Sequence, residues 1–200
     1  MKVLDNLSDS ELLQAMRSGD ERAFALLYRR RQPAIYRFAL QMCGSTALAE
    51  DVTQEVFVVL IRDKHAFDAQ RGSLSSFLFG VARNQLLRRL QRERFYSPLE
   101  PASDESAESS DGPVEKFSRS EIIESVRKAV LSLPDRYREV VVLCDLEEMS
   151  YVETAEILGC AIGTVRSRLH RGRSLLIEKL RPASASDVDP GEVKTARYFA

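Results

Sequence analysis

The chain has 200 residues, of which 44% are hydrophobic, and its net charge at pH 7 is −1. This length allows one domain or two small ones, and the overall charge alone does not indicate a nucleic-acid-binding protein. The longest apolar runs, such as residues 56–61, are too short to span a bilayer, and no signal peptide is evident, which predicts a cytoplasmic protein without membrane insertion.

The sequence carries none of the common marks of an enzyme. It contains no glycine-rich phosphate loop, no Gly-x-Ser-x-Gly motif and no cluster of metal ligands, so we expect no catalytic residue, metal or cofactor. Cys43, Cys144 and Cys160 lack metal-ligand spacing, and their odd number argues against a disulfide framework. We expect them to be small hydrophobic side chains, with a redox role as the less favoured alternative.

Charge is sorted along the chain into blocks of opposite sign. Residues 83–94 hold five arginines and one acid, residues 97–115 hold six acids and no base, and residues 162–181 hold six Lys or Arg and one acid. Such blocks indicate two basic surfaces separated by an acidic segment, which the net charge conceals.

Helical periodicity covers the first half of the chain. A capping box at residues 8–11 predicts a helix through Met16, ended by Gly19, and helix follows from 21 to 42, which Pro33 should kink or restart. A further helix is expected over 47–62, with Leu48, Val52, Val56 and either Val59 or Leu60 inward. A long helix from 73 to 94 has apolar residues at every fourth position, namely Leu74, Leu78, Ala82, Leu86 and Leu90.

The second half begins beyond an acidic segment rich in Ser and Pro, which cannot bury a core and is expected to be a flexible linker. Helices are predicted over 120–133 and 134–145, with Pro134 at a first helical position, and the tail after 182 should be disordered. The prediction is an all-α protein of two small helical domains joined by this linker, with the divisions 8–95, 96–119, 120–181 and 182–200.

Residues 150–173 have the pattern of a DNA-binding helix-turn-helix. Ser150 and Glu153 form a capping box, the first helix has Val152, Ala155 and Leu158 as a buried stripe, and Gly159 suits a left-handed turn. In the second helix Val165, Leu169 and Leu176 are expected inward. Two-helix corners and solvated arginine-rich helices are common in helical proteins. The number of basic residues gathered on this one short helix nevertheless favours contact with DNA. The outward residues are Thr164, Arg166, Ser167, Arg168, His170, Arg171 and Arg173.

With these motifs, the chain resembles the extracytoplasmic-function branch of bacterial sigma factors over roughly residues 8–181. The similarity rests on separate segments in the expected order rather than on any one of them. They are 19–24 with Leu27-Tyr28, 49–57, 76–84, Leu133-Pro134 with 137–140, and the helix-turn-helix.

The resemblance implies a role for each segment. Asp51, Gln54 and Glu55, beside apolar Val58, would contact core RNA polymerase, and Phe57 is either a further contact or a core residue. The loop at 67–73 would capture a flipped base of the minus-ten element, and the helix-turn-helix would read the minus-thirty-five element.

The long basic helix also fits single-stranded DNA on its own chemistry. Phe77, Asn84, Arg88 and Arg92 fall roughly on one face, which combines an aromatic stacking platform with amide and guanidinium groups. Phe77 equally fits a core aromatic, and it stands where the family most often has tryptophan. The residues expected at the minus-ten element are Arg71, Phe77, Asn84 and Arg88.

The expected partners are therefore core RNA polymerase, promoter DNA and, by resemblance, an anti-sigma factor. The main alternative is a repressor or activator that binds its operator alone, usually as a dimer. A regulator of that kind would need neither a second basic domain nor a face that binds polymerase.

Overall fold

The computed structural model describes residues 6–63, 67–68, 72–96 and 119–181. Within these ranges every regular element is a helix, as the all-α prediction requires. Arg71, the tail after 181 and the expected linker, apart from its end residues Tyr96 and Arg119, lie outside the described residues. The elements are α1 (Asp9–Arg17), α2 (Glu21–Cys43), α3 (Thr46–Arg62), α4 (Leu74–Tyr96), α5 (Arg119–Leu131), α6 (Asp135–Val141), the π-helical turn η3 (Val142–Leu146), α7 (Tyr151–Leu158) and α8 (Ile162–Leu180).

Local capping signals set the first helices. The predicted box at the start of α1 is present, since the Glu11 amide donates to Ser8 Oγ and the Ser8 amide donates to Glu11 Oε2 at 2.8 Å. Asp20 accepts from the amides of the first turn of α2, and Gly44 ends α2 in the left-handed conformation with φ of 71°. These caps satisfy backbone groups that have no partner inside the helix.

The predicted restart at Pro33 is wrong, because α2 runs through this residue to Cys43. Pro33 has no amide hydrogen to donate to the carbonyl of Arg29, four residues earlier. Both residues lie on the exposed side of the helix, where solvent can satisfy that carbonyl.

Helices α1 to α4 enclose an apolar core. Phe38 of α2 and Phe79 of α4 are almost completely buried and meet edge to face, with ring centroids 5.4 Å apart. The predicted stripe of α4 is buried at Leu74, Leu78, Ala82 and Leu86, while Leu90 is half-buried. In α3 the inward residue at the end of the stripe is Leu60 rather than Val59, and Leu48 is half-buried. Each fully buried large apolar side chain stabilises the fold by about 1.5–3 kcal/mol.

Helices α5 to α8 form a second helical group. Its buried cluster consists of Leu133, Val140, Val141, Ala155, Val165 and Leu169. Pro134 lies just before α6 rather than at its first helical position, and the predicted helix over 134–145 is divided into α6 and the π-helical turn η3.

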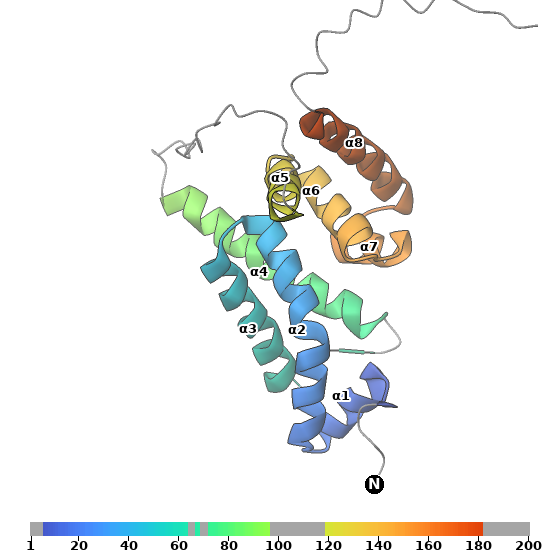
Figure 1. Cartoon of the computed structure of the whole chain (residues 1–200). Coiled ribbons are helices and arrows are strands. Elements are labelled where there is room, and N and C mark those ends of the chain that lie inside the picture. The colour runs from blue at the N-terminus through green and yellow to red at the C-terminus, as the bar shows by residue number, and fades with distance from the viewer. Residues whose placement is uncertain (1–5, 64–66, 69–71, 97–118, 182–200) are drawn as a thin grey trace, which may run out of the picture.

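The two groups pack against each other, with α7 beside the N-terminal part of α4 and α5 beside the end of α2 (Figure 1). Val130, Val142, Leu143 and Met149 of the second group belong to the apolar cluster of the first. The core of the N-terminal half therefore extends into the C-terminal half. No described helix has the length and apolar character needed to cross a membrane.

Candidate nucleic-acid interfaces

The helix-turn-helix forms as the sequence predicts. The Glu153 amide donates to Ser150 Oγ, and the Ser150 amide donates to Glu153 Oε2, which completes the capping box of α7. Gly159 ends α7 with φ of 62°, a conformation that is strained for residues with a side chain. The turn then places α8 across the face of α6.

The predicted inner stripe of α7 is wrong at Val152, whose side chain is 53% exposed. The buried positions are Thr154 and Ala155, and Leu158 is half-buried. The Thr154 hydroxyl lies 3.3 Å from the Cys144 sulfur, so a polar side chain is accommodated inside by a local partner. Burial raises the pKa of the Cys144 thiol, which keeps it protonated and unreactive at neutral pH.

Helix α8 presents most of the residues predicted to contact DNA. Val165 and Leu169 are buried and Leu176 is half-buried, as expected. On the other side, Arg166, Ser167, His170, Arg171 and Arg173 are exposed, whereas Thr164 and Arg168 are half-buried.

Three of these arginines are held by partners that precede α8 in the sequence. Arg173 donates twice to the Asp145 carboxylate, at 2.6 and 3.1 Å, and this pairing raises the pKa of the guanidinium. The Arg171 side chain bonds to Tyr137 and lowers the pKa of that phenol, and the guanidinium of Arg166 lies 5.9 Å from the centre of the Tyr151 ring. These contacts fix the direction of side chains that would otherwise move freely.

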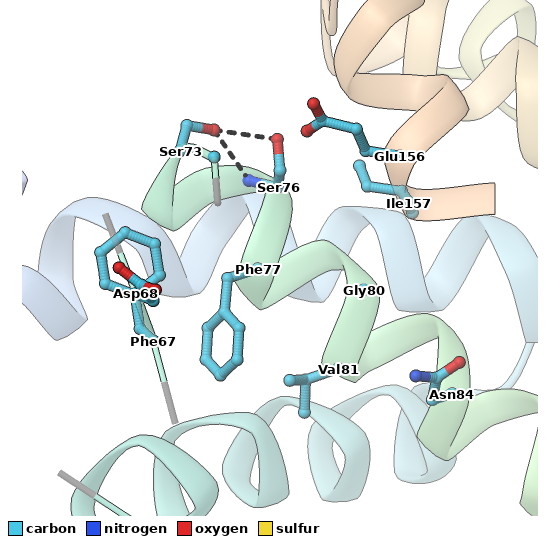
Figure 2. Close-up of a pocket in the computed structure, with 11 residues that line it drawn as sticks. Phe67, Asp68, Ser73, Ser76, Phe77, Gly80, Val81, Asn84, Glu156 and Ile157 are labelled. Atoms are coloured by element: carbon cyan, nitrogen blue, oxygen red, sulfur yellow. Dashed lines mark hydrogen bonds between the residues drawn. The ribbon is translucent and has the colours of Figure 1, made fainter. Parts of the chain in front are cut away.

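A second candidate site is a cavity of about 360 Å³ beside the start of α4 (Figure 2). Phe77 forms one wall, with its ring centroid 5.7 Å from that of Phe67, and Asn84 lies two turns further along the helix. Arg17 donates to the Phe67 carbonyl at 2.7 Å, which ties the segment before α4 to α1. The full lining is Phe67, Asp68, Gly72, Ser73, Ser76, Phe77, Gly80, Val81, Asn84, Glu156 and Ile157.

The structure brings together part of the predicted minus-ten group. Phe77 and Asn84 share the cavity, with Phe77 half-buried and Asn84 exposed. Arg88 is exposed on α4 one turn beyond Asn84 and does not line the cavity. The half-buried state of Phe77 agrees with both of its predicted roles, since it packs against the core and also faces the cavity.

Helix α7, from the C-terminal half, lines one side of this cavity. Glu156 and Ile157 project from α7 towards the side of α4 that carries Ser76 and Gly80 (Figure 2). Beside them, Ser73 Oγ donates to Glu153 Oε1 at 3.0 Å. Partial burial raises the pKa of Glu153, but hydrogen bonds from Ser150 and Ser73 lower it by more. The pKa of Glu153 therefore lies below its ordinary value.

The face predicted to bind polymerase lies on α3. Asp51 and Gln54 are exposed, and Glu55 and Val58 beside them are half-buried. Asp51 pairs with Arg89 of α4 at 2.9 Å, an exposed ion pair that contributes little to stability. Phe57 is only 2% exposed, so it belongs to the core.

Two ion pairs between the halves were not predicted from the sequence. Arg83 of α4 donates to both carboxylate oxygens of Glu139, at 2.8 and 3.3 Å, and Arg37 of α2 donates to both oxygens of Glu147, at 3.3 and 3.0 Å. Burial raises the pKa of Glu147, although Arg37 opposes the shift. The partners are 56 and 110 residues apart, so no local pattern could have revealed them.

Comparisons with known proteins identify both halves. Residues 27–96 match the model of sigma-70 region 2, and residues 123–176 match that of sigma-70 region 4. The ECF RNA polymerase sigma factor SigW of Bacillus subtilis (strain 168) is 33% identical over 178 residues, which cover 84% of this chain and 95% of SigW.

Two solved structures have the same fold. The structure of CnrH in complex with the cytosolic domain of CnrY is 26% identical with a TM-score of 0.64, covering 85% of this chain and 95% of that one. The sigma factor RpoE in complex with the anti-sigma factor NepR from Bartonella quintana is 24% identical with a TM-score of 0.63, covering 78% of this chain and 96% of RpoE.

Proposed function

This chain belongs to the extracytoplasmic-function RNA polymerase sigma factors, and we propose that its two halves read two separate elements of a promoter. It acts with core RNA polymerase and promoter DNA in promoter-specific initiation of transcription. Sigma factors regulate transcription without enzymatic activity, and we propose that this chain likewise contributes no catalytic group of its own and works in the cytoplasm.

The C-terminal half is assigned to the minus-thirty-five element. The observation that carries this assignment is the exposed arginine face of α8, which follows a capped helix and a left-handed glycine turn. A helix of this kind enters the major groove, where guanidinium groups recognise guanine edges and phosphates. The residues that bind there are Thr164, Arg166, Ser167, Arg168, His170, Arg171 and Arg173.

The N-terminal half is assigned to the minus-ten element. An aromatic wall at Phe77 and an amide at Asn84 suit the stacking and edge recognition of an unpaired base, and Arg71 and Arg88 would neutralise phosphates. Phenylalanine offers a smaller stacking surface than tryptophan at this position. The chain is accordingly divided into a DNA-melting domain (8–95), a linker (96–119), a helix-turn-helix domain (120–181) and a tail (182–200).

An anti-sigma factor is the proposed regulator. RpoE was solved with the anti-sigma factor NepR, which supports the same class of partner for this chain. The partner would hold the factor away from polymerase or promoter DNA.

Run-off transcription from a genomic fragment library tests the function directly. Core RNA polymerase is assayed with and without the protein, and we expect discrete new start sites that require both components. Tight footprints from the protein alone, without polymerase-dependent initiation, would instead identify a stand-alone regulator.

Substituting alanine at Asp51, Gln54 and Glu55 together is expected to weaken binding to core polymerase by at least about tenfold, because interface positions that matter cost more than about 1 kcal/mol each. Fluorescence anisotropy of the labelled protein titrated with core polymerase measures the effect. Glu21→Gln, at an exposed position of α2, is the control and should bind as the parent protein does. Equal affinity of the triple variant and the parent protein would show that this face does not contact polymerase.

Replacing Arg168 by alanine is expected to cost about 1–3 kcal/mol of promoter binding and to relax selectivity at one position of the upstream element. We assign Arg173, which is exposed on α8, to a phosphate, so Arg173→Ala should weaken binding to all sequences alike. Transcription from promoters mutated singly across that element separates the two outcomes. Full selectivity in the Arg168 variant would show that this residue does not read a base.

A further inference from the structure

Arg17 connects α1 to the cavity proposed to receive a base. It is the last residue of α1, and Nη2 of its guanidinium donates to the Phe67 carbonyl oxygen at 2.7 Å, although the two residues are 50 positions apart in the sequence. Phe67 itself lies in no helix, and its side chain lines the cavity beside α4. A residue of α1 therefore holds the backbone of a segment whose side chain forms part of the site.

Helix α1 is held firmly in its turn. Leu12 and Leu13 are buried in the core of the N-terminal half, and Asp9 at the start of α1 pairs with Arg30 of α2 at 2.8 Å. A helix that is close-packed in this way has little freedom to shift. Arg17 therefore donates to Phe67 from a fixed position.

The direction of the Arg17 side chain is unusual for an arginine at the end of a helix. Such a side chain ordinarily reaches into solvent or back to the last carbonyls of its own helix. Arg17 is instead half-buried, and its Nε is buried without a hydrogen-bond partner among the described residues. A buried donor without a partner costs free energy, so this position does not improve the solvation of the arginine. Its effect is on the segment that carries Phe67.

Phe67 adds a second aromatic ring to the wall that Phe77 forms. The Phe67 side chain is 7% exposed, and its ring centroid lies 5.7 Å from that of Phe77 with the ring planes inclined by 58° (Figure 2). An unpaired base gains most from stacking when the aromatic surfaces already stand in place, because ordering them on binding would reduce the affinity. The bond from Arg17 supplies that order before DNA arrives.

We propose that Arg17 is a positioning residue of the minus-ten site, which holds the Phe67 ring beside Phe77 so that the cavity is preformed for one unpaired base. This inference rests on the proposed binding of the minus-ten element by the N-terminal half. Arg17 does not line the cavity and acts only through the Phe67 backbone. Loss of the bond lowers the fraction of molecules with a formed wall, and the apparent affinity for the base falls in the same proportion.

The test uses holoenzyme assembled from core RNA polymerase and the full chain. The probe is a fluorescein-labelled single-stranded oligonucleotide that carries the minus-ten sequence found by run-off transcription, together with copies that have an abasic site at one position at a time. The position whose loss weakens binding by the parent protein most identifies the base that enters the cavity. For Arg17→Ala we expect about tenfold weaker binding of the intact oligonucleotide, equivalent to about 1.4 kcal/mol, and unchanged binding of the copy that lacks this base.

The ratio of these two affinities separates positioning from general stability. A merely structural loss would weaken both oligonucleotides alike, and a ratio equal to that of the parent protein would overturn the proposal. Arg22→Ala makes the same change in charge at an exposed position of α2 and should keep the parent ratio. Arg17→Met retains the apolar stem without a donor, so it should reproduce the loss and provides the same measurement if the alanine variant does not fold.

A second comparison asks whether Arg17 acts through Phe67. Phe67→Leu removes the ring and keeps an apolar side chain, so no ring remains to be positioned. In this background we expect Arg17→Met to weaken binding of the intact oligonucleotide by less than about twofold, because the effects of two residues that act through one contact do not add. A tenfold loss in both backgrounds would show that Arg17 acts independently of Phe67 and would overturn the proposal.

Failure of this inference is distinguishable from failure of the proposed function. If an abasic site weakens binding by the parent protein and by the Arg17 variants in the same ratio, the inference alone is rejected. If no abasic site weakens binding by the parent protein, the assignment of the cavity to an unpaired base is rejected, and the inference with it.

Discussion

Replacing Arg138 by alanine is expected to lower the free energy of unfolding by about 3 kcal/mol, because hydrogen bonds from a charged donor contribute about 1.5–3 kcal/mol each and do not add fully. The guanidinium donates to the carbonyls of Met42 at 2.7 Å and Leu133 at 2.9 Å, and also to that of Leu131. Two of these carbonyls lie at the ends of α2 and α5, where no helical amide can reach them. Arg138 of α6 therefore joins the ends of α2 and α5 at carbonyls that lack a helical partner.

Urea denaturation of the purified protein measures this loss. Arg136→Ala is the matched control, since its exposed guanidinium lies 4.7 Å from the centre of the Tyr137 ring and also bonds to that side chain, contacts that should cost less than about 1 kcal/mol when lost. Arg138→Lys retains the charge but lacks the planar fork, so an intermediate stability is expected. Similar losses for the Arg138 and Arg136 alanine variants would contradict the role given to the three carbonyls.

A single methyl group at Gly172 is expected to destabilise the C-terminal half by about 1–3 kcal/mol, the usual cost of overpacking a close contact. Its Cβ would lie 2.7 Å from Val141 Cγ2 and 3.4 Å from the Tyr137 carbonyl oxygen. Val141 is β-branched and nearly rigid about its first side-chain bond, so α8 would have to move away from α6.

Gly163 provides the comparison on the same helix. A Cβ there would meet nothing within 4 Å, so Gly163→Ala should gain up to about 1 kcal/mol from helix propensity. The difference between the midpoints of urea unfolding of the two variants is the measured quantity. Equal stability of the two would mean that α6 and α8 separate at no cost.

What the sequence predicted correctly was mostly local. The capping boxes at Ser8 and Ser150 and the left-handed Gly159 depend on residues within one turn of each other, and all three are present. The all-α fold follows from periodicity over long segments. The arginine face of α8 was also accessible, because alternation of apolar and basic residues at helical spacing decides which side is outward.

The errors and omissions came from long-range packing. Val152 fits an apolar stripe by spacing, but α7 packs against α4 and α8 with Thr154 inward, where its hydroxyl lies against the Cys144 sulfur. The pairing of Arg37 with Glu147 spans 110 positions, and neither residue stands out from its neighbours in the sequence. The burial of Gly172 depends on how closely α6 approaches α8, which no sequence period encodes.

Of the two surfaces proposed to bind DNA, one is exposed and the other is partly covered by the C-terminal half. The arginine face of α8 is exposed while α7 lies over the cavity of α4. Under the proposed division of the promoter, the upstream duplex therefore meets an uncovered surface, whereas the downstream strand meets a site that the C-terminal half partly lines. Binding of the upstream element and opening of the DNA strands then become separate steps. Binding determines the position on the chromosome, and strand opening determines how long initiation takes.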